Sequence, residues 1–497
     1  MTKNSLPAEA QARVRELRAR HPRFFYDGFS LERQDSGLCV QYQFRIEPDL
    51  SFTPQTTLEN VDWRRVEQIP QALLENLVFH LGLIEMLSYW KAACSPEMVV
   101  RAGVLTPEQV AWWTDLLRKG MGEYFCVNRI DFLPVDFLRI VSARSSTSSA
   151  VIPSEQGESR DLLFPFDRRS SMESPRRPVE GGAQRLDAVL VSGGKDSVVT
   201  LETLRAAGRS FDCVLLNPTQ AALDIAKQAG CEQPIIVRRT IDPRLLELNA
   251  AGYLNGHTPF SALLAFLGVT VAALFGHGRV MVSNERSAEE ATVEYLGEPI
   301  NHQYSKTFQF ESAFRKYSQT YLTPDIEYFS LLRPLYELQI AQRFAQYPEY
   351  FSLFRSCNRG QSTNSWCGRC PKCLFVYTAL YPFLEREQIL GIFRSAERHA
   401  DLFAWEGAAE VLRALLGLDK EKPFECVGTR EETLAAVHWC IEKHRAQGIA
   451  LPAALETIQE TALSARTDVP QLTQRILTSW TDQHFLPLDI SNLLRVR

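Results

Sequence analysis

A short run of glycines, hydroxyl side chains and one lysine, SGGKDS at residues 192–197, directly follows an apolar stretch. Glycine backbone N–H groups can closely approach an anion, the serine hydroxyls can donate hydrogen bonds, and Lys195 adds positive charge. This combination suits a phosphate or pyrophosphate. The run is not a Walker A loop, because Val189 and Asp196 stand where that loop needs a glycine and a serine or threonine, and the G-x-G-x-x-G spacing is also missing. An ordinary glycine-rich turn is the alternative.

A second candidate site is a group of four cysteines within CNRGQSTNSWCGRCPKC. Two overlapping C-x-x-C steps and a fourth thiol across a short loop provide four soft ligands, which suits tetrahedral zinc. Because the protein would supply all four ligands, such a zinc ion would be structural. An iron–sulfur cluster, redox chemistry at one C-x-x-C pair and four unrelated thiols are the alternatives. The four residues are Cys357, Cys367, Cys370 and Cys373.

The elements that must position the SGGKDS run alternate between strands and helices. Short apolar runs rich in β-branched residues predict strands, and longer amphipathic or apolar runs predict helices. This alternation predicts a parallel sheet covered on both faces, with the SGGKDS run at its carboxyl edge, where ligands bind. The expected strands are LDAVLVS, FDCVLLN (211–217), PIIVRR and RVMVSNE (279–285), and the expected helices are VVTLETLRAAG, AALDIAKQAG and the apolar run at 260–275.

The N-terminal part of the chain predicts both strands and helices. Within CVQYQFRI (39–46) four apolar residues alternate with other residues, which predicts a half-buried strand with Val40, Tyr42, Phe44 and Ile46 on one face. The run TPEQVAWWTDLLRKG (106–120) has a capping threonine at its start and a glycine at its end, which predicts a helix.

Composition limits the class of protein. The chain has 497 residues, 45% of them apolar, and a formal net charge of −5, which argues against a nucleic-acid-binding body. The N-terminus lacks the apolar core of a secretory signal, and the apolar run at 260–275 is too short to span a bilayer. We therefore expect a soluble cytoplasmic protein that does not bind membranes. Its 11 cysteines should stay reduced unless a metal binds them.

The order S-G-G-K-D-S resembles the pyrophosphate loop of the N-type ATP pyrophosphatases, the PP-loop family. This resemblance implies that ATP is cleaved between its α- and β-phosphates, that a carboxylate or carbonyl oxygen is adenylated, and that pyrophosphate leaves. Asp196 would also help hold Mg²⁺, and Lys195 is expected to be exposed at the sheet edge. The residues that would bind the phosphates are Ser192, Gly193, Gly194, Lys195, Asp196 and Ser197.

Five further stretches narrow the resemblance. Together with the loop and the cysteines they resemble the MurL family of UDP-N-acetylmuramoyl-L-alanyl-L-glutamate epimerases, over most of the chain except 144–185. The resemblance implies an isomerase of peptidoglycan precursor synthesis that inverts the terminal L-Glu of UDP-MurNAc-L-Ala-L-Glu, with ATP, Mg²⁺ and a structural Zn²⁺. The stretches are NGHTPFSALLA (255–265), SNERSAEE (283–290), NHQYSKTFQFE (301–311), KPFECVGTREE (422–432) and GMGEYFCVNRIDF (120–132).

Adenylation would neutralise the glutamate carboxylate and make its α-proton more acidic, so that a base can remove the proton and an acid can return one. Position near strand ends makes His257, His302 and Glu285 candidates, and Cys426 could reach over from the C-terminal segment. Each could instead pack or satisfy backbone groups. Glu289 is a candidate on the same positional ground, and Glu425 stands beside Cys426 in the same segment. Asn284, Arg286 and Lys306 could bind substrate carboxylate or diphosphate.

The expected fold is α/β with a parallel-sheet PP-loop core. Two other functions remain open: a PP-loop enzyme that modifies a nucleobase or tRNA, such as a deazaguanine-nitrile synthase or a thiolase, and a non-catalytic nucleotide-binding protein. The expected segments are an α+β domain over 1–143, a polar linker over 144–185, an ATP-binding α/β domain over 186–335, a zinc-binding segment over 336–385 and a helical region over 386–497.

Overall fold

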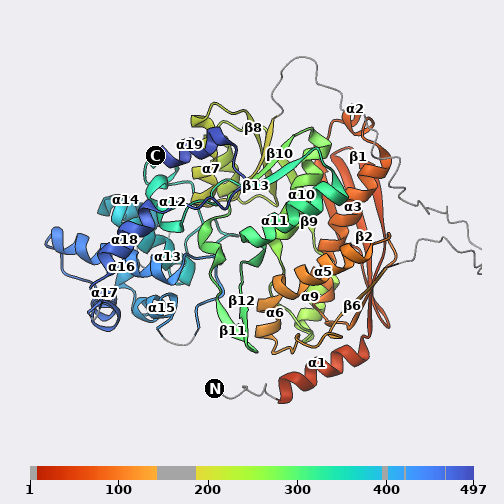
Figure 1. Ribbon diagram of the computed structural model, residues 1–497, viewed down its shortest axis with the longest axis horizontal. Coiled ribbons are helices and arrows are strands. Elements are labelled where there is room, and N and C mark those ends of the chain that lie inside the picture. Colours follow the sequence, from red (N-terminus) through yellow and green to blue (C-terminus); the bar gives the residue numbers. More distant parts are fainter. Residues whose placement is uncertain (1–7, 143–185, 395–400, 419–420, 465, 497) are drawn as a thin grey trace, which may run out of the picture.

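One large mixed sheet runs through the protein and is covered by helices. The structure, a computed structural model, describes residues 8–142, 186–394, 401–418, 421–464 and 466–496, so the expected linker lies outside the described residues. The N-terminal segment and the C-terminal helices lie at opposite ends of the molecule (Figure 1, red and blue). The fold is therefore mixed α/β, as the alternating pattern predicts.

The strands around the SGGKDS run form the parallel part of the sheet. They lie in the order β9-β8-β7-β10-β13, and all four pairings between them are parallel. In chain order this is 3-2-1-4-5, so the direction of winding reverses between β7 and β10. In open parallel sheets, the crevice beyond the strand ends at such a reversal is where ligands bind. The bounds are β7 (Asp187–Leu190), β8 (Phe211–Leu216), β9 (Ile235–Thr240), β10 (Arg279–Val282) and β13 (Glu327–Ser330).

The N-terminal strands extend this same sheet. β4 pairs antiparallel with β9, placing Leu58 opposite Val237, and β2, β1, β5 and β6 follow in that order, while β3 pairs with β2. The predicted strand over 39–46 is confirmed, because its four alternating apolar side chains are all buried. The bounds are β1 (Arg23–Gln34), β2 (Gly37–Ile46), β3 (Leu50–Phe52), β4 (Gln55–Glu59), β5 (Glu97–Val100) and β6 (Arg139–Ser142).

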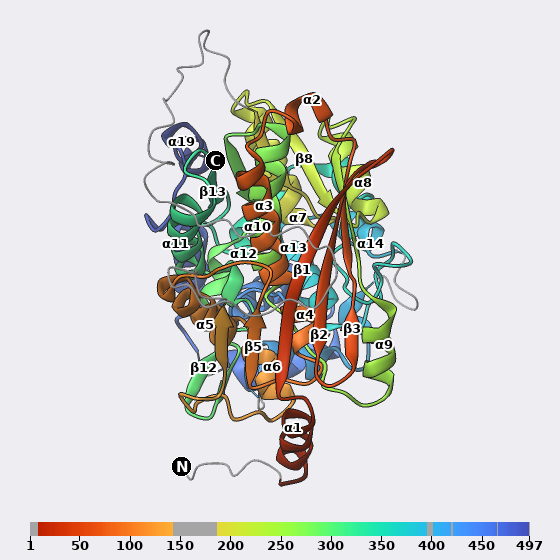
Figure 2. The same cartoon turned by 90° about the vertical axis from the view of Figure 1, so that its right-hand side faces the viewer.

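Both faces of the parallel strands are buried. Along β7 and just beyond it, Ala188 and Leu190 pack into one core while Val189 and Val191 pack into another. α3 (Gln71–Glu85) and α10 (Phe260–Phe275) belong to the first core and lie side by side (Figure 2), and α7 (Lys195–Ala206) and α8 (Gln220–Gln228) belong to the second. A Cβ atom on Gly268 would stand 2.6 Å from Val280 Cγ1, so α10 packs directly on the sheet.

The remaining helices surround the sheet and form the C-terminal body. The predicted helix over 106–120 is confirmed as α5, which Thr106 caps together with Gln109. The N-terminal and central helices are α1 (Ala8–Arg20), α2 (Trp63–Val66), α4 (Leu87–Trp90), α5 (Pro107–Gly120), α6 (Gly122–Val127), α9 (Pro243–Ala250) and α11 (Phe308–Tyr317). A hairpin of β11 (Val293–Tyr295) and β12 (Glu298–Ile300) precedes α11.

The C-terminal part of the chain begins at α12, and the stretch over 386–497 contains helices and no strand in its described residues. Its helices are α12 (Glu337–Phe344), α13 (Pro371–Leu380), α14 (Arg386–Ile392), α15 (Ala408–Leu415), α16 (Arg430–Ala446), α17 (Ala453–Ile458), α18 (Val469–Thr478) and α19 (Leu488–Val496). Short 3₁₀ or π turns occur along the chain at η1 (Arg286–Glu289), η2 (Tyr304–Lys306), η3 (Ser318–Leu322), η4 (Pro348–Tyr350), η5 (Tyr381–Phe383), η6 (Leu402–Ala404) and η7 (Gln459–Leu463).

One stretch of the described residues, Gln71–Trp90, is long and apolar enough to cross a membrane by length and composition. However, 72% of its most apolar window is buried inside the fold. Apolar residues on all sides of a helix are also typical of a helix in a protein core. The burial therefore identifies this stretch as a core element.

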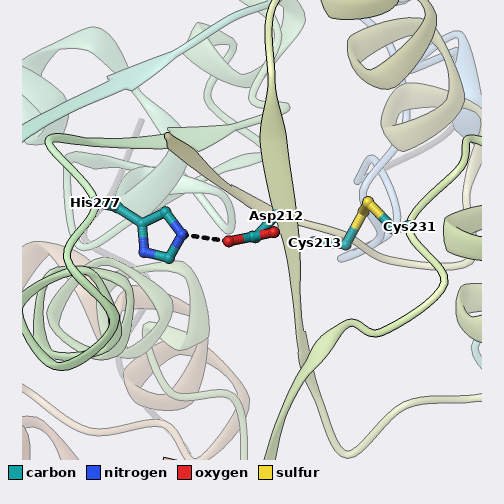
Figure 3. The surroundings of a disulfide bond; sticks show 4 residues. All are labelled: Asp212, Cys213, Cys231 and His277. Carbon is teal, nitrogen blue, oxygen red and sulfur yellow. Dashed lines mark hydrogen bonds and ion pairs between the residues drawn. A yellow bond between two sulfur atoms is a disulfide. The ribbon is translucent and has the colours of Figure 1, made fainter. Parts of the chain in front are cut away.

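The expectation that the cysteines are all reduced is wrong for one pair. The structure joins Cys213 and Cys231 in a disulfide, with their Cα atoms 6.2 Å apart, while the other nine cysteines are free (Figure 3). Cys213 on β8 belongs to the core that α8 covers, and Cys231 follows the end of α8. Packing α8 onto β8 therefore brings the two Cα atoms within the range that a disulfide requires.

Candidate active site

The SGGKDS run connects β7 to α7 at the point where the winding of the sheet reverses. The Ser192 backbone N–H donates to Ser197 Oγ at 2.9 Å, and the two serine hydroxyl oxygens lie 3.1 Å apart. Gly194 is the N-cap of α7 and has no side chain that could occupy the first N–H groups of the helix. These N–H groups and the positive end of the helix dipole are suited to an anion.

Close packing requires a glycine at position 193. A Cβ atom there would stand 2.8 Å from the Ala221 Cβ at the start of α8 and 3.2 Å from the Arg355 carbonyl oxygen. The Arg355 backbone N–H donates to the Gly193 carbonyl at 2.6 Å. The loop is therefore held between α8 and the segment that leads to the four cysteines.

Lys195 is buried, which corrects the expectation that it is exposed at the sheet edge. Its side chain is only 3% exposed, because its ammonium group forms ion pairs with Asp196, at 2.5 Å, and with Glu337, the first residue of α12. Burial alone would lower the pKa of Lys195, but the two carboxylates outweigh burial and raise this pKa above its ordinary value. The lysine thus stays charged beneath the loop.

Three carboxylates converge beside this lysine. Oxygen atoms of Asp196, Glu285 and Glu337 all lie within 4.8 Å of one another. Burial, followed by the charge of Asp196, raises the pKa of Glu337 above its ordinary value, while the ion pair with Lys195 acts in the opposite direction. Glu285 follows β10, so β7 and β10 each deliver a carboxylate to the same sheet edge. Hard oxygen donors of this kind are the ligands that Mg²⁺ prefers.

A buried arginine holds two segments of the site together. Arg333, 1% exposed, donates to the carbonyl oxygen of Glu285 at 2.8 Å and to that of Lys306. Its charge is balanced by the buried Glu311 at 3.3 Å. Lys306 Nζ lies 3.9 Å from Glu285 Oε1, beside the carboxylate cluster.

A second cluster of titratable side chains comes from four distant segments. His302 Nδ1 lies 2.5 Å from Glu123 Oε2, and His302 Nε2 lies 3.8 Å from Cys426 Sγ. His257 Nδ1 lies 3.8 Å from the same Glu123 oxygen, and the two imidazole rings are 4.6 Å apart. The fold thus brings together His257, His302 and Cys426, three of the residues predicted to transfer protons. Another of them, Glu285, lies in the carboxylate cluster instead.

Opposite charges in this second cluster stabilise the ionised forms of Cys426 and His302. Burial would raise the pKa of Cys426, but Lys306, His302 and Lys372 outweigh burial and lower it to about 6. Burial would likewise lower the pKa of His302, but Cys426 and Glu123 raise it to about 9. Near neutral pH the pair is therefore a thiolate beside an imidazolium.

His257 and Lys306 complete the electrostatic arrangement. Burial, and then the charge of His302, lower the pKa of His257 to about 4, so this ring is neutral. Although burial acts against its charge, the pKa of Lys306 is raised, chiefly by Cys426 and then by Glu285 and Asp196. Because Lys306 interacts with groups of both clusters, the two clusters form one continuous site.

Four further candidates form hydrogen bonds with neighbouring side chains. The Glu289 carboxylate accepts from Arg333, and Glu425 accepts from Asn358 at 2.8 Å. The two remaining polar candidates bond to serines: Asn284 donates to Ser330 Oγ at 3.2 Å and Arg286 to Ser479 Oγ at 2.7 Å.

Two residues of the site were not found by sequence reasoning. Glu123 lies inside the stretch GMGEYFCVNRIDF, but no spacing relates it to a histidine that follows 179 positions later. Glu337 follows no motif and is separated from Lys195 by 142 positions. Neither residue lies beside a predicted strand end, the criterion that identifies most of the other candidates.

The four cysteines of the second candidate site do converge. Their sulfur atoms lie 4.0 Å apart for Cys357–Cys370, 3.7 Å for Cys367–Cys373 and 3.4 Å for Cys370–Cys373. A tetrahedral zinc with Zn–S bonds near 2.3 Å would separate its sulfurs by about 3.8 Å. Cys370 also caps α13, since its sulfur accepts from the Cys373 backbone N–H at 3.4 Å. The arrangement fits a closed, four-thiolate metal site.

If this site is structural, Cys370→Ser should lose the metal and unfold at a lower temperature than the unsubstituted protein. A structural zinc contributes folding free energy directly, because the unfolded chain has no preformed site. Metal analysis of the unsubstituted protein should find about one zinc per chain. Thermal denaturation should show the lower unfolding temperature of Cys370→Ser. Cys440→Ser is the matched control, since Cys440 is a buried thiol outside the cluster. A metal-free preparation of equal stability would contradict a structural role.

Comparison with known proteins relates this geometry to one family. A model of the MurL N-terminal domain matches residues 15–331, and a model of the MurL C-terminal domain matches residues 353–469. The first match contains the SGGKDS run, the carboxylate Glu285, and the histidines His257 and His302. The second contains the four cysteines and Cys426.

Three relatives are each named UDP-N-acetyl-alpha-D-muramoyl-L-alanyl-L-glutamate epimerase. The relative from a Micromonospora species is 34% identical over 79% of this chain and 81% of its own. That from Salinispora tropica is 36% identical over 74% and 73%, and that from Xanthomonas oryzae pv. oryzae is 33% identical over 72% of each chain. With both family models matched in order and this similarity spread along most of its length, the chain belongs to the MurL family.

Proposed function

We propose that this chain is an isomerase that inverts the terminal L-Glu of UDP-MurNAc-L-Ala-L-Glu to D-Glu, after ATP has activated the glutamate carboxylate by adenylation. The names of the three relatives give the substrate. The observation that carries the proposal for this chain is that Lys306 joins the loop with its carboxylates to the cluster of proton-transferring groups. Activation and proton transfer can then act on one bound substrate.

The first half of the site serves adenylation. The loop N–H groups, Ser192, Ser197 and Lys195 bind the phosphates of ATP. Asp196, Glu285 and Glu337 fit Mg²⁺, which when bound would neutralise phosphate charge as pyrophosphate leaves. Because Lys195 forms ion pairs with Asp196 and Glu337, its ammonium group is positioned before the nucleotide binds.

Adenylation solves a definite chemical difficulty. Removing the α-proton of a free carboxylate places a second negative charge beside the first. Once the carboxylate carries AMP it is an uncharged acyl group, and the α-proton becomes much more acidic. The neutral His257 then accepts a proton, and the imidazolium of His302, which Glu123 orients, donates one. Hydrolysis releases the inverted acid and AMP.

The decisive experiment incubates the protein with ATP, Mg²⁺ and UDP-MurNAc-L-Ala-L-Glu. Chiral analysis should find D-Glu, and nucleotide analysis should find AMP and pyrophosphate. A reaction without ATP is the control and should leave the substrate unchanged. ADP and orthophosphate would contradict adenylation, whereas L-Glu recovered unchanged from the complete reaction would contradict the isomerase. Since ATP is an intracellular compound, we place this reaction in the cytoplasm.

A further inference from the structure

The Glu123–His302–Cys426 arrangement has the order carboxylate, imidazole, thiol. We propose that Cys426 is a nucleophile that takes the activated glutamyl group from AMP as a thioester, and that inversion takes place on this thioester. The inference rests on the proposed function, because adenylation must supply the activated acyl group. It adds a covalent intermediate to the reaction and assigns the thiol a role other than proton transfer.

The geometry assigns each of the three residues a separate role. Glu123 Oε2 lies 2.5 Å from His302 Nδ1, which fixes the ring and leaves its Nε2 facing Cys426 Sγ at 3.8 Å. A nucleophile beside an imidazole that a third group orients is the arrangement by which thiols and hydroxyls are activated for acyl transfer. Glu123 is the second residue of α6, so a helix holds the orienting carboxylate in place.

Exposure separates Cys426 from the other thiols. Of the nine free cysteines, all are buried except Cys367 and Cys426, and Cys367 belongs to the four-cysteine cluster. A buried thiol in apolar surroundings is inert, whereas a partly exposed thiol beside positive charges is reactive. Lys306 and His302 supply those charges, and they lower the pKa of Cys426 against the effect of burial.

Lys306 also explains how the acyl group would reach the thiol. Its ammonium group lies 3.9 Å from Glu285 and interacts with Cys426. With its phosphate at the loop, the adenylate would have its carbonyl carbon on the side of Lys306 that faces the thiol. Transfer to sulfur would leave AMP at the loop and the acyl group beside His257 and His302.

The steps balance without an oxidant or reductant. The thiolate attacks the carbonyl carbon, the bond from that carbon to the AMP oxygen breaks, and the oxygen leaves with AMP. A base removes the α-proton and an acid returns one. Water then attacks the thioester carbonyl, the C–S bond breaks and the thiolate is restored. Sulfur donates little electron density to a carbonyl group, so the α-proton of a thioester is more acidic than that of an oxygen ester.

The direct test is a single turnover with excess protein, ATP, Mg²⁺ and UDP-MurNAc-L-Ala-L-Glu, quenched in acid within milliseconds to seconds. The intact mass should rise by the mass of the substrate minus water. Neutral hydroxylamine should remove the adduct, and peptide mapping should place it on Cys426. Pyrophosphate and D-Glu formed without any such adduct would overturn the thioester while leaving the proposed function in place. Absence of pyrophosphate would instead contradict the proposed function.

A variant separates the nucleophile from a proton-transferring thiol. Cys426→Ala should still release pyrophosphate in the first turnover but should release AMP about a thousandfold more slowly, because no thiolate attacks the adenylate. A thiol that only moves protons predicts normal AMP release by hydrolysis without inversion, and that result would overturn the proposal. Cys440→Ser should form the adduct normally, and circular dichroism should verify that each variant is folded.

A positioning role for Glu123 gives an independent readout. In the unsubstituted protein, alkylation of Cys426 by iodoacetamide should fall as the pH drops below about 6, where the thiolate becomes protonated. The groups that set this midpoint are Lys306, His302 and Lys372, with Glu123 acting through His302. Glu123→Gln should move the midpoint upward, because a less basic imidazole carries less positive charge. An unchanged midpoint would contradict the relay from Glu123 through His302 to Cys426.

Discussion

Replacing Lys195 with methionine should reduce substrate-dependent pyrophosphate release by at least about 100-fold, since a positive group that meets developing phosphate charge stabilises a transition state by about 3 kcal/mol. The ammonium group is held at the start of α7 by Asp196 and Glu337, and residues 192–197 contain no other cationic side chain that could replace it. The measurement is pyrophosphate release at saturating ATP and dipeptide substrate. Release at the original rate would show that the loop does not act on the phosphates.

Burial of Lys195 requires a stability control for this experiment. Removing one partner of a buried ion pair leaves an unpaired charge and costs about 3–5 kcal/mol. Glu337 is that partner, with its side chain only 7% exposed. The double variant Lys195→Met, Glu337→Gln should recover much of the unfolding temperature without recovering pyrophosphate release. Recovery of both would show that the single substitution acts through folding alone.

The sequence predicts those features that depend on neighbouring residues. Alternation of strands and helices places the SGGKDS run at a carboxyl edge, because a short apolar run ends there and a helix begins. The spacing of Cys367, Cys370 and Cys373 is likewise local, and a helix cap at Cys370 is sufficient to bring two of these sulfurs together. Features of this kind require no knowledge of the tertiary fold.

Features that depend on distant partners could not be predicted. The burial of Lys195 requires Glu337, which reaches the loop only because α12 packs against α7. The role of Glu123 depends on a contact between α6 and the segment that follows β12. The pairing of β4 with β9, which joins the N-terminal strands to the parallel sheet, follows from no local pattern. The Cys213–Cys231 disulfide similarly depends on how α8 packs on β8.

Inversion in D₂O should label the α-carbon of the D-glutamyl product and also that of the recovered L-substrate. The reason lies in the arrangement of the two histidines, whose rings are only 4.6 Å apart. Two groups that flank an α-carbon must each stand about 3–3.5 Å from it on opposite sides, and rings in mutual contact cannot do so. His257 and His302 therefore act from one side, and the planar intermediate must present each face to them in turn.

His302→Gln should abolish this labelling, because the variant has no imidazolium to donate the proton; loss of a positioned acid or base costs about 10²–10⁴-fold. Pyrophosphate release in the first turnover should persist, since adenylation precedes proton removal. His438→Gln on α16, outside the cluster, is the matched control and should label normally. NMR or mass spectrometry of the isolated glutamate measures the label.

The distribution of label tests the one-sided arrangement itself. Deuterium in the D-product together with an unlabelled L-substrate would mean that the proton leaves and arrives on opposite faces, through groups other than the two neighbouring histidines. Full retention of the original hydrogen would contradict exchange with solvent altogether. Because Glu123 contacts both rings, at 2.5 Å and 3.8 Å, Glu123→Gln should slow labelling of substrate and product alike. Slower labelling of the substrate alone, or of the product alone, would show that the two histidines act on opposite faces of the α-carbon.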